Sequence, residues 1–344
     1  MSETGTGEAL ERRPAGAGTA VPLLEVRGLA KHFPFRRGAF ARREHLRAVD
    51  GVSFTLGRDR VFSLVGESGC GKSTVARLVL RLLEPTGGEV LFKGRNISAL
   101  HGEELKRFRR GAQIIFQDPF ASLNPRRTVF DTVAEPMRIH ALAPPEELRD
   151  RVTALLEKVG LQDVMDRYPH EFSGGQRQRI CIARALAVSP ELIVADEPLS
   201  ALDVSIQAQI MNLLMDLRRE SGISYLFISH DLHVVEYLSD EVAVMYLGKI
   251  VEQAPADELF REPRHPYTVV LLSSAPSLKP TGREKVILTG EVPSPLNVPP
   301  GCPFHPRCPR RFEPCDRVVP RLAAESGRPV ACHLWNTPRL ETGD

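Results

Sequence analysis

Residues 61–82 read VFSLVGESGCGKSTVARLVLRL, which is an apolar run, then a glycine-rich turn, then a segment with helical periodicity. The turn matches G-x-x-x-x-G-K-[ST], a phosphate-binding pattern when a strand precedes it and a helix follows. Its glycines let backbone N–H groups turn inward, and together with the helix N-terminus these form an anion site. We expect Lys72 to reach the β- and γ-phosphates of a nucleotide and the Ser73 hydroxyl to ligate Mg²⁺. The predicted phosphate loop comprises Gly66, Glu67, Ser68, Gly69, Cys70, Gly71, Lys72, Ser73 and Thr74.

The flanking sequence predicts the fold. Apolar runs at 61–66, 112–117, 192–196 and 224–229 predict buried strands of a largely parallel sheet. Helical periodicity between them predicts two apolar faces, formed by Val75, Leu78, Val79 and Leu82 and by Ile206, Ile210, Leu213, Leu214 and Leu217. Strands that alternate with such helices indicate an α/β fold. We expect the strand-poor stretch of about 98–187 to form an inserted helical subdomain.

A second chemical motif follows the apolar run at 192–196, which ends in Asp196 and is followed by Glu197. A carboxylate at the carboxyl end of a strand, opposite a phosphate loop, can hold Mg²⁺ or its waters, which is the role expected for Asp196. Glu197 is then placed to act as general base toward the attacking water. Such a pair alone often marks only the end of a strand, so its weight comes from the phosphate loop in the same fold.

The segment SGGQRQR, residues 173–179, resembles the signature sequence of ATP-binding-cassette (ABC) ATPases. Other motifs of that family follow in order. Gln117 resembles the Q-loop glutamine, Ser200 to Asp203 the D-loop, and His230 the switch histidine. The motif begins with Phe172, where many members have Leu, and this change keeps the position hydrophobic.

The resemblance implies a fold and a division of labour. The fold is a P-loop ABC nucleotide-binding domain in which two cassettes pair head to tail around ATP. Gln117 would sense Mg²⁺ and water, His230 would steady the γ-phosphate, and Asp203 would communicate across the dimer. Catalysis would thus involve Glu197, His230, Gln117 and Lys72, while the partner's ATP would be contacted by Ser173, Gly174, Gly175 and Gln176. An aromatic ring stacks on adenine in this family, and Phe33 is the candidate, with Phe35 as the competitor.

Several segments narrow the family. FQDPFASLNPR (116–126), YPHEFSGGQRQR (168–179), HPYT (265–268) and GEVPSPLNVPPGCPFHPRC (290–308) resemble oligopeptide/dipeptide importer ATPases, and the tail resembles the second of their two ATPase subunits. Implied partners are a paralogous ATPase in a heterodimer, two membrane permeases and an extracytoplasmic solute-binding protein. The implied location is the cytoplasmic face of the membrane. Alternatives are an importer for nickel or another non-peptide solute, and a soluble ABC ATPase of DNA repair or translation.

Composition is compatible with this assignment. The chain has 344 residues, of which 42% are hydrophobic and 26% charged, and its net charge is +2. The near balance of charges argues against a nucleic-acid partner, which normally requires a clustered basic face. The sequence contains no apolar run of the roughly 18 residues that a membrane-spanning helix needs. We expect a disordered start at 1–21, the ATPase domain at 22–263 and a C-terminal extension at 264–344.

The extension is irregular, rich in proline and rich in cysteine. Cys302, Cys308, Cys315 and Cys332 lie in one short stretch, whereas Cys70 and Cys181 stand alone. In a cytosolic chain such a cluster suggests metal rather than disulfides. The spacing favours a [4Fe–4S] cluster over structural Zn²⁺, with His305 and His333 as alternative ligands. The structural alternative is that these are small buried residues of a module with little core of its own.

Overall fold

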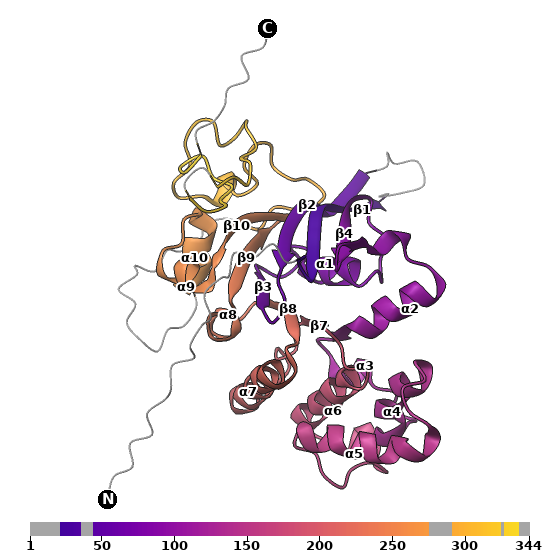
Figure 1. Ribbon diagram of the computed structural model, residues 1–344. Helices are drawn as coiled ribbons and strands as arrows, with labels where there is room; N and C mark the ends of the chain where they lie inside the picture. The colour runs from indigo at the N-terminus through magenta and orange to yellow at the C-terminus, as the bar shows by residue number, and fades with distance from the viewer. Residues whose placement is uncertain (1–20, 36–43, 275–290, 325–326, 337–344) are drawn as a thin grey trace, which may run out of the picture.

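The computed structural model of the chain describes residues 21–35, 44–274, 291–324 and 327–336 (Figure 1). The disorder expected for residues 1–21 therefore falls, except for Val21, outside the described residues. The fold is α/β, and the description below follows its two sheets, the helices that cover them and the C-terminal segment.

A six-stranded sheet with the strand order β10-β9-β3-β8-β7-β6 forms the centre of the molecule. Its strands are β3 (Val61–Val65), β6 (Ala112–Ile115), β7 (Leu192–Asp196), β8 (Ser224–Ser229), β9 (Glu241–Tyr246) and β10 (Lys249–Pro255). All pairs are parallel except β9 with β10. The four strands predicted from apolar runs are β3, β6, β7 and β8. Because the carboxyl ends of parallel strands meet at one edge, the loops after these strands lie together.

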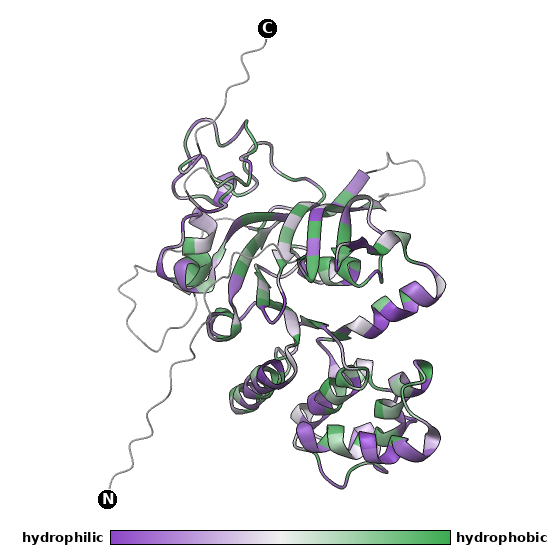
Figure 2. Ribbon diagram, viewed as in Figure 1, coloured by the Kyte–Doolittle hydropathy of each residue, from purple (hydrophilic) through white to green (hydrophobic). Residues whose placement is uncertain are grey.

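A four-stranded antiparallel sheet with the order β2-β1-β4-β5 packs beside the first. It contains β1 (Leu24–Phe35), β2 (Glu44–Leu56), β4 (Gly87–Phe92) and β5 (Arg95–Asn96), and the turn η1 (Ile97–Ala99) follows. The stacked rings of Phe54 and Phe62, 4.6 Å apart, join the two sheets. Figure 2 shows that hydrophobic residues are abundant in these strands, whereas α2 (Gly102–Gly111) is largely hydrophilic.

The helix α1 (Lys72–Val79) lies in the core that the sheets share. Val75, Leu78 and Val79 are buried as predicted, but Leu82 is 51% exposed. The prediction for Leu82 was wrong because the helix ends at Val79 and the chain then leaves the helical path. The buried face predicted for α7 (Val204–Ser221) is confirmed, since Ile210, Leu214 and Leu217 are buried while Ile206 and Leu213 are partly buried.

A group of helices lies below the sheets in Figure 1. They are α3 (Pro119–Ser122), α4 (Val129–Ile139), α5 (Leu148–Lys158) and α6 (Gly174–Leu186), with the short turns η2 (Pro145–Glu147) and η3 (Pro169–Glu171). Of this group, α4, α5 and α6 share an apolar core with residues of β6, β7 and β8. The preceding helix α2 packs differently, because its Phe108 contacts Phe92 of β4 edge to face at 5.3 Å. The predicted stretch of about 98–187 is therefore divided between two packing environments, and its limits as a subdomain stay a prediction.

The C-terminal segment packs against the edge of the central sheet. Helices α8 (Leu232–Leu238), α9 (Ala256–Arg261) and α10 (Pro266–Ser274) lead to it, and it contains the turn η4 (His305–Arg307). Phe304, Cys302 and Cys315 belong to the same core cluster as residues of β9, β10 and α9. The Ala331 N–H donates to the Val251 carbonyl at 2.8 Å, so the segment also bonds to β10. Prolines prevent long helices here, and the segment shares its core with β9, β10 and α9 rather than forming one alone.

Candidate functional site

The loop between β3 and α1 has the backbone shape that a phosphate site requires. Gly71 precedes α1 with φ +110°, and a Cβ there would lie 2.1 Å from the Ala48 carbonyl oxygen. Gly66 has φ +153°, and its Cβ would lie 2.2 Å from the Met245 carbonyl oxygen. Only glycine fits both positions, because any side chain would clash with backbone. The glycine pattern that identified the loop in the sequence is thus explained by the neighbouring strands.

Lys72 is the first residue of α1, and its side chain is buried within this loop. It is 4% exposed, and its Nζ donates to the carbonyl oxygens of Gly66 at 2.8 Å and Glu67 at 3.1 Å. A buried ammonium at a helix N-terminus creates a strongly positive position. Burial raises the pKa of the neighbouring Cys70 thiol, so Cys70 fills space in the loop as a neutral side chain. The loop therefore fits a polyphosphate in both charge and shape.

The hydroxyl of Ser73, on α1, is hydrogen-bonded to the carboxylate of Asp196, at the end of β7. Ser73 Oγ donates to Asp196 Oδ1 at 2.9 Å, although the two residues are 123 positions apart in the sequence. Burial and the neighbouring Glu197 charge raise the pKa of Asp196, while the Ser73 hydrogen bond opposes the shift. A divalent cation would relieve the crowding of two carboxylates here, and a hydroxyl with a carboxylate is the oxygen ligand set that Mg²⁺ prefers. The residues present therefore fit the expected Mg²⁺ site.

The side chains of Gln117 and His230 both contact the same carboxylate oxygen of Glu197. Gln117 Nε2 donates to Glu197 Oε2 at 3.0 Å, and His230 Nδ1 lies 3.2 Å from the same oxygen. Glu197 has a φ of +49°, in the left-handed region that non-glycine residues rarely adopt. Its N–H donates to the Ile228 carbonyl of β8 at 3.0 Å, which holds this conformation in place. The three residues come from the ends of β6, β7 and β8, where the parallel sheet brings them together.

The signature segment lies on a different part of the molecule. Ser173 caps α6, accepting the Gln176 N–H, while the Gln176 side chain accepts the Ser173 N–H at 3.1 Å. A Cβ on Gly175 would lie 2.5 Å from Ile206 Cγ2, so this glycine allows α6 to approach α7 closely. A Cβ on Gly174 would make only an ordinary contact with Leu202, at 3.5 Å. The segment thus presents a capped helix N-terminus whose local contacts are with the start of α7.

The structure also places three other predicted residues, Asp203, Phe33 and Phe35. Asp203 begins α7, and its carbonyl accepts the N–H groups of Ile206 and Gln207, each at 2.9 Å. Phe33 lies on β1 with Lys31 Nζ 5.2 Å from its ring, and Phe35, at the end of the same strand, is 42% exposed. The structure therefore presents both aromatic candidates on the antiparallel sheet and leaves the choice between them open.

Known proteins are similar to this chain over most of its length. A family model described as ABC transporter matches residues 49–200, and one described as oligopeptide/dipeptide transporter, C-terminal region, matches residues 251–315. The dipeptide transport ATP-binding protein DppF of Escherichia coli is 51% identical over 313 residues, covering 90% of this chain and 94% of that protein. The chain belongs to the ATP-binding proteins of the oligopeptide/dipeptide ABC transporters. It is thus an ABC-type ATPase.

Other relatives agree with this family. The oligopeptide transport ATP-binding protein AppF of Bacillus subtilis is 52% identical over 321 residues, covering 91% of this chain and 98% of that protein. Among solved structures, cbiO1 of Clostridium perfringens, part of an ABC transporter complex, has a TM-score of 0.60 at 29% identity, covering 70% of this chain and 91% of that one. A dimeric ATP-binding cassette with bound ADP and Pi, in a post-hydrolysis state, has a TM-score of 0.59 at 29% identity, covering 68% of this chain and 98% of that one.

In this ABC ATPase, two residues whose role the sequence did not indicate also contact the phosphate loop. The Glu67 carboxylate forms two hydrogen bonds with the Arg307 guanidinium, at 2.9 and 3.1 Å. The Glu67 N–H donates to the Tyr267 hydroxyl at 2.9 Å. Tyr267 belongs to the HPYT segment and Arg307 to the segment 290–308, and both segments resembled the family without indicating a role for either residue. Both contacts join residues at least 200 positions apart.

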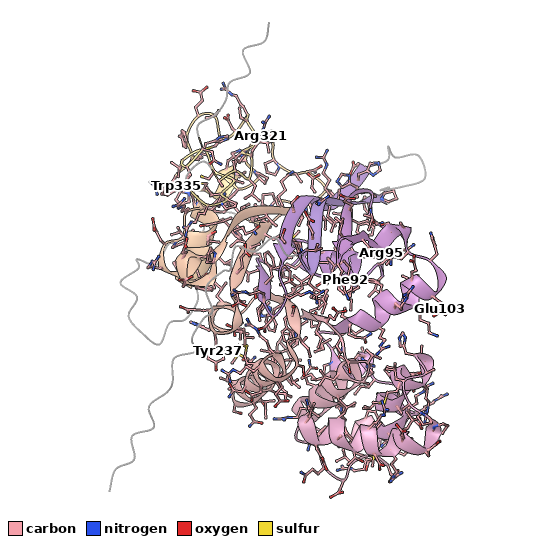
Figure 3. The ribbon with its side chains drawn as sticks, in the orientation of Figure 1. Phe92, Arg95, Glu103, Tyr237, Arg321 and Trp335 are labelled. Atoms are coloured by element: carbon pink, nitrogen blue, oxygen red, sulfur yellow. The ribbon has the colours of Figure 1, made fainter. Side chains whose placement is uncertain are left out.

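The four cysteines of the extension line one small cavity, together with His265, His305 and His333. Burial raises the pKa of the Cys302 thiol to about 12 and that of Cys332 to about 11, and the neighbouring cysteines add to the shifts. Within the described residues, however, no three or more His, Cys, Asp or Glu side chains form a group able to hold a metal ion. As placed, the four cysteines therefore do not form the predicted metal cluster. Trp335, labelled in Figure 3, lies near the end of the described C-terminal segment, and its indole N–H donates to the Arg264 carbonyl at 2.9 Å.

Among the described residues, no helix combines the length and the apolar character needed to cross a bilayer.

Proposed function

We propose that this chain energises a peptide importer, binding MgATP between its phosphate loop and the signature segment of a second cassette. The observation that carries the proposal is the meeting of Ser73 with Asp196, next to a Glu197 carboxylate that Gln117 and His230 both contact. Lys72 and the loop N–H groups would bind the phosphates, and Ser73, Asp196 and Gln117 would hold Mg²⁺. When bound, Mg²⁺ would neutralise phosphate charge and orient the γ-phosphate.

The geometry supports a general-base role for Glu197. Its side chain is 13% exposed, so the carboxylate is largely shielded from solvent but not fully buried. Gln117 and His230 fix the orientation of Oε2, which leaves the other oxygen to accept the proton from the attacking water. His230 is 57% exposed and can turn from Glu197 toward the γ-phosphate. The bond to γ-phosphorus then forms from the water oxygen as the bond to the ADP oxygen breaks.

The second half of each ATP site comes from another chain in this proposal. The capped N-terminus of α6, with Ser173 to Gln176, offers N–H donors and a positive dipole end to a phosphate. Asp203 at the start of α7 lies beside it and would relay the state of one site to the other. A paralogous ATPase is the proposed partner, and Phe33 is the proposed adenine platform.

The proposals for the solute and the location are supported by the names of the relatives. Because DppF of Escherichia coli is a dipeptide transport protein and AppF of Bacillus subtilis an oligopeptide transport protein, we assign small peptides to this system. The proposed partners are two membrane permeases and an extracytoplasmic solute-binding protein, which place the chain on the cytoplasmic face of the membrane. Residues 22–263 would form the ATPase domain and 264–344 the extension.

The test of this function is Glu197→Gln in the purified transporter. ATP hydrolysis is expected to fall about 10²- to 10⁴-fold, the usual loss when a general base is removed, while ATP binding is retained. Glu191→Gln is the matched control, because Glu191 precedes the opposite end of β7 and pairs with Arg58 and Lys93 at the surface. Hydrolysis by Glu197→Gln within threefold of the wild type would rule out Glu197 as the base.

We further propose that the cavity lined by the four cysteines takes up a [4Fe–4S] cluster or Zn²⁺ once the thiols draw together. The support is their shared cavity, since four thiols from separate turns line one small volume. Metal analysis of chain purified without oxygen tests this. The expected result is about four irons or one zinc per chain, absent after the four cysteines are changed to serine. Metal-free wild-type chain that is as stable as metal-treated chain would disprove it.

A further inference from the structure

The C-terminal segment reaches the phosphate loop directly. Arg307 lies in η4, and its side chain is 6% exposed, whereas that of Glu67 is 26% exposed. The two hydrogen bonds are parallel, Nη1 to Oε2 at 2.9 Å and Nη2 to Oε1 at 3.1 Å, which is the bidentate geometry of the strongest arginine–carboxylate pairs. The loop residue Glu67 is therefore held by a residue 240 positions later in the chain.

The same loop residue is held on its backbone side. Tyr267 is fully buried, and its hydroxyl accepts the Glu67 N–H at 2.9 Å. Its ring packs at 4.7 Å from Tyr246 of β9 and at 5.4 Å from Phe304, which precedes η4. Tyr246 in turn lies edge to face with Phe304 at 5.4 Å. These three buried rings join the sheet, α10 and the C-terminal segment into one unit that positions Glu67.

Charge gives this contact a consequence for nucleotide binding. A carboxylate in a phosphate loop repels the polyphosphate, and the repulsion is strong where little water screens it. The guanidinium of Arg307 neutralises Glu67 and draws its side chain toward the C-terminal segment. Hydrogen bonding to Glu67 raises the pKa of Arg307, which favours the charged guanidinium.

We propose that Arg307 and Tyr267 are positioning residues for ATP binding, so that docking of the C-terminal segment sets the affinity of the phosphate loop. The inference rests on the proposed role of this loop in binding ATP. Removal of Arg307 leaves a free negative charge beside the phosphates, and removal of the Tyr267 hydroxyl frees the Glu67 backbone. Either change weakens the binding of a polyphosphate without altering Glu197, Gln117 or His230.

Equilibrium titration of the full-length chain with a fluorescent ATP analogue and Mg²⁺ tests the proposal. Arg307→Gln and Tyr267→Phe are each expected to raise the Kd about tenfold, within the range of couplings between residues in contact. Arg307→Lys, which keeps the charge, is expected to lie between Arg307→Gln and the wild type. The double variant Glu67→Gln/Arg307→Gln is expected to recover most of the affinity, because both charges are then absent.

Arg317→Gln is the matched control, because Arg317 lies in the same segment but pairs with Glu313 on an exposed surface. A Kd within twofold of the wild type for both Arg307→Gln and Tyr267→Phe would overturn the proposal. A double variant as weak as Arg307→Gln alone would overturn the charge argument. If Arg307→Gln does not fold, Arg307→Lys and Tyr267→Phe decide the outcome. Lys72→Ala is a separate measure, since unchanged binding by that variant would contradict the function of the loop and not the role of Arg307.

Discussion

The buried ion pair between Arg328 and Glu252 gives the strongest single prediction of stability. Glu252 on β10 is completely buried, and it accepts the N–H groups of Arg264 at 2.8 Å and His265 at 2.9 Å. Arg328 Nη2 lies 3.3 Å from the same carboxylate and also donates to the Glu262 carbonyl. The pair joins the C-terminal segment to the edge of the central sheet.

Arg328→Met removes the cation and leaves the Glu252 charge buried. Breaking a buried pair by removing one partner costs about 3–5 kcal/mol, far more than the exposed pairs on the surface contribute. We expect the loss to appear first as undocking of the C-terminal segment, since the pair lies at the junction. The segment also bonds to the sheet through the Ala331 N–H and the Gln253 N–H, which report on this docking.

Native-state hydrogen exchange at these two amides measures the prediction. In Arg328→Met, the free energy of opening at Ala331 and Gln253 should fall by about 3–5 kcal/mol, or to zero if docking is weaker than that. Arg317→Met is the control, and its exposed pair with Glu313 should cost less than about 1 kcal/mol. A loss below about 1 kcal/mol in Arg328→Met would refute the reasoning and assign docking to the apolar contacts of Phe304.

Three further predictions concern the loop, the pH dependence and the adenine site. Gly71→Ala should lower the free energy of unfolding by about 1–3 kcal/mol more than Gly69→Ala, measured by denaturant titration. The reason is that a Cβ at Gly71 would clash with the Ala48 carbonyl, whereas a Cβ at Gly69 would have no atom within 4 Å. Burial raises the pKa of Glu241, so ionisation of its carboxyl group costs stability as the pH rises through that pKa. Glu241→Gln should therefore raise the melting temperature at pH 8 and change it less at pH 5. Equal changes in melting temperature at the two pH values would contradict this. Phe33→Ala should raise the Kd for ATP about five- to tenfold, as expected for loss of one stacked base, and leave the Kd for inorganic triphosphate unchanged. If Phe35→Ala shows this pattern and Phe33→Ala does not, Phe35 is the adenine platform.

Much of the site was predictable because its motifs are local. The loop 66–74 carries its own geometry, since the glycines, Lys72 and Ser73 act on one phosphate group and must be close in sequence. Asp196 and Glu197 were recognised at the end of an apolar run, whereas Gln117 and His230 were recognised by their resemblance to the Q-loop and switch positions of ABC ATPases. The resemblance assigned the roles of Gln117 and His230, and the chemistry of carboxylates opposite a phosphate loop assigned those of Asp196 and Glu197.

Contacts between distant segments were not predictable in this way. No pattern near Glu67 indicates Arg307 or Tyr267, because pairing over at least 200 positions depends on where β9, α10 and the C-terminal segment come together. Leu82 shows the same limit on a small scale: helical periodicity continues past Val79, but the chain turns away there. The four cysteines were expected to bind metal, and as placed they line a cavity without forming a group able to hold an ion.

The sequence by itself determined the α/β class, the phosphate loop and the family, because these depend on local periodicity and on residue types at fixed spacing. Only the tertiary structure decided that Ser73 meets Asp196, that Glu197 adopts a positive φ, and that Arg307 and Tyr267 hold Glu67. The physical reason is the strand order β10-β9-β3-β8-β7-β6, which places side chains from distant segments at one edge of a sheet. That order results from burial and hydrogen bonding summed over the whole chain, which no single stretch of sequence encodes.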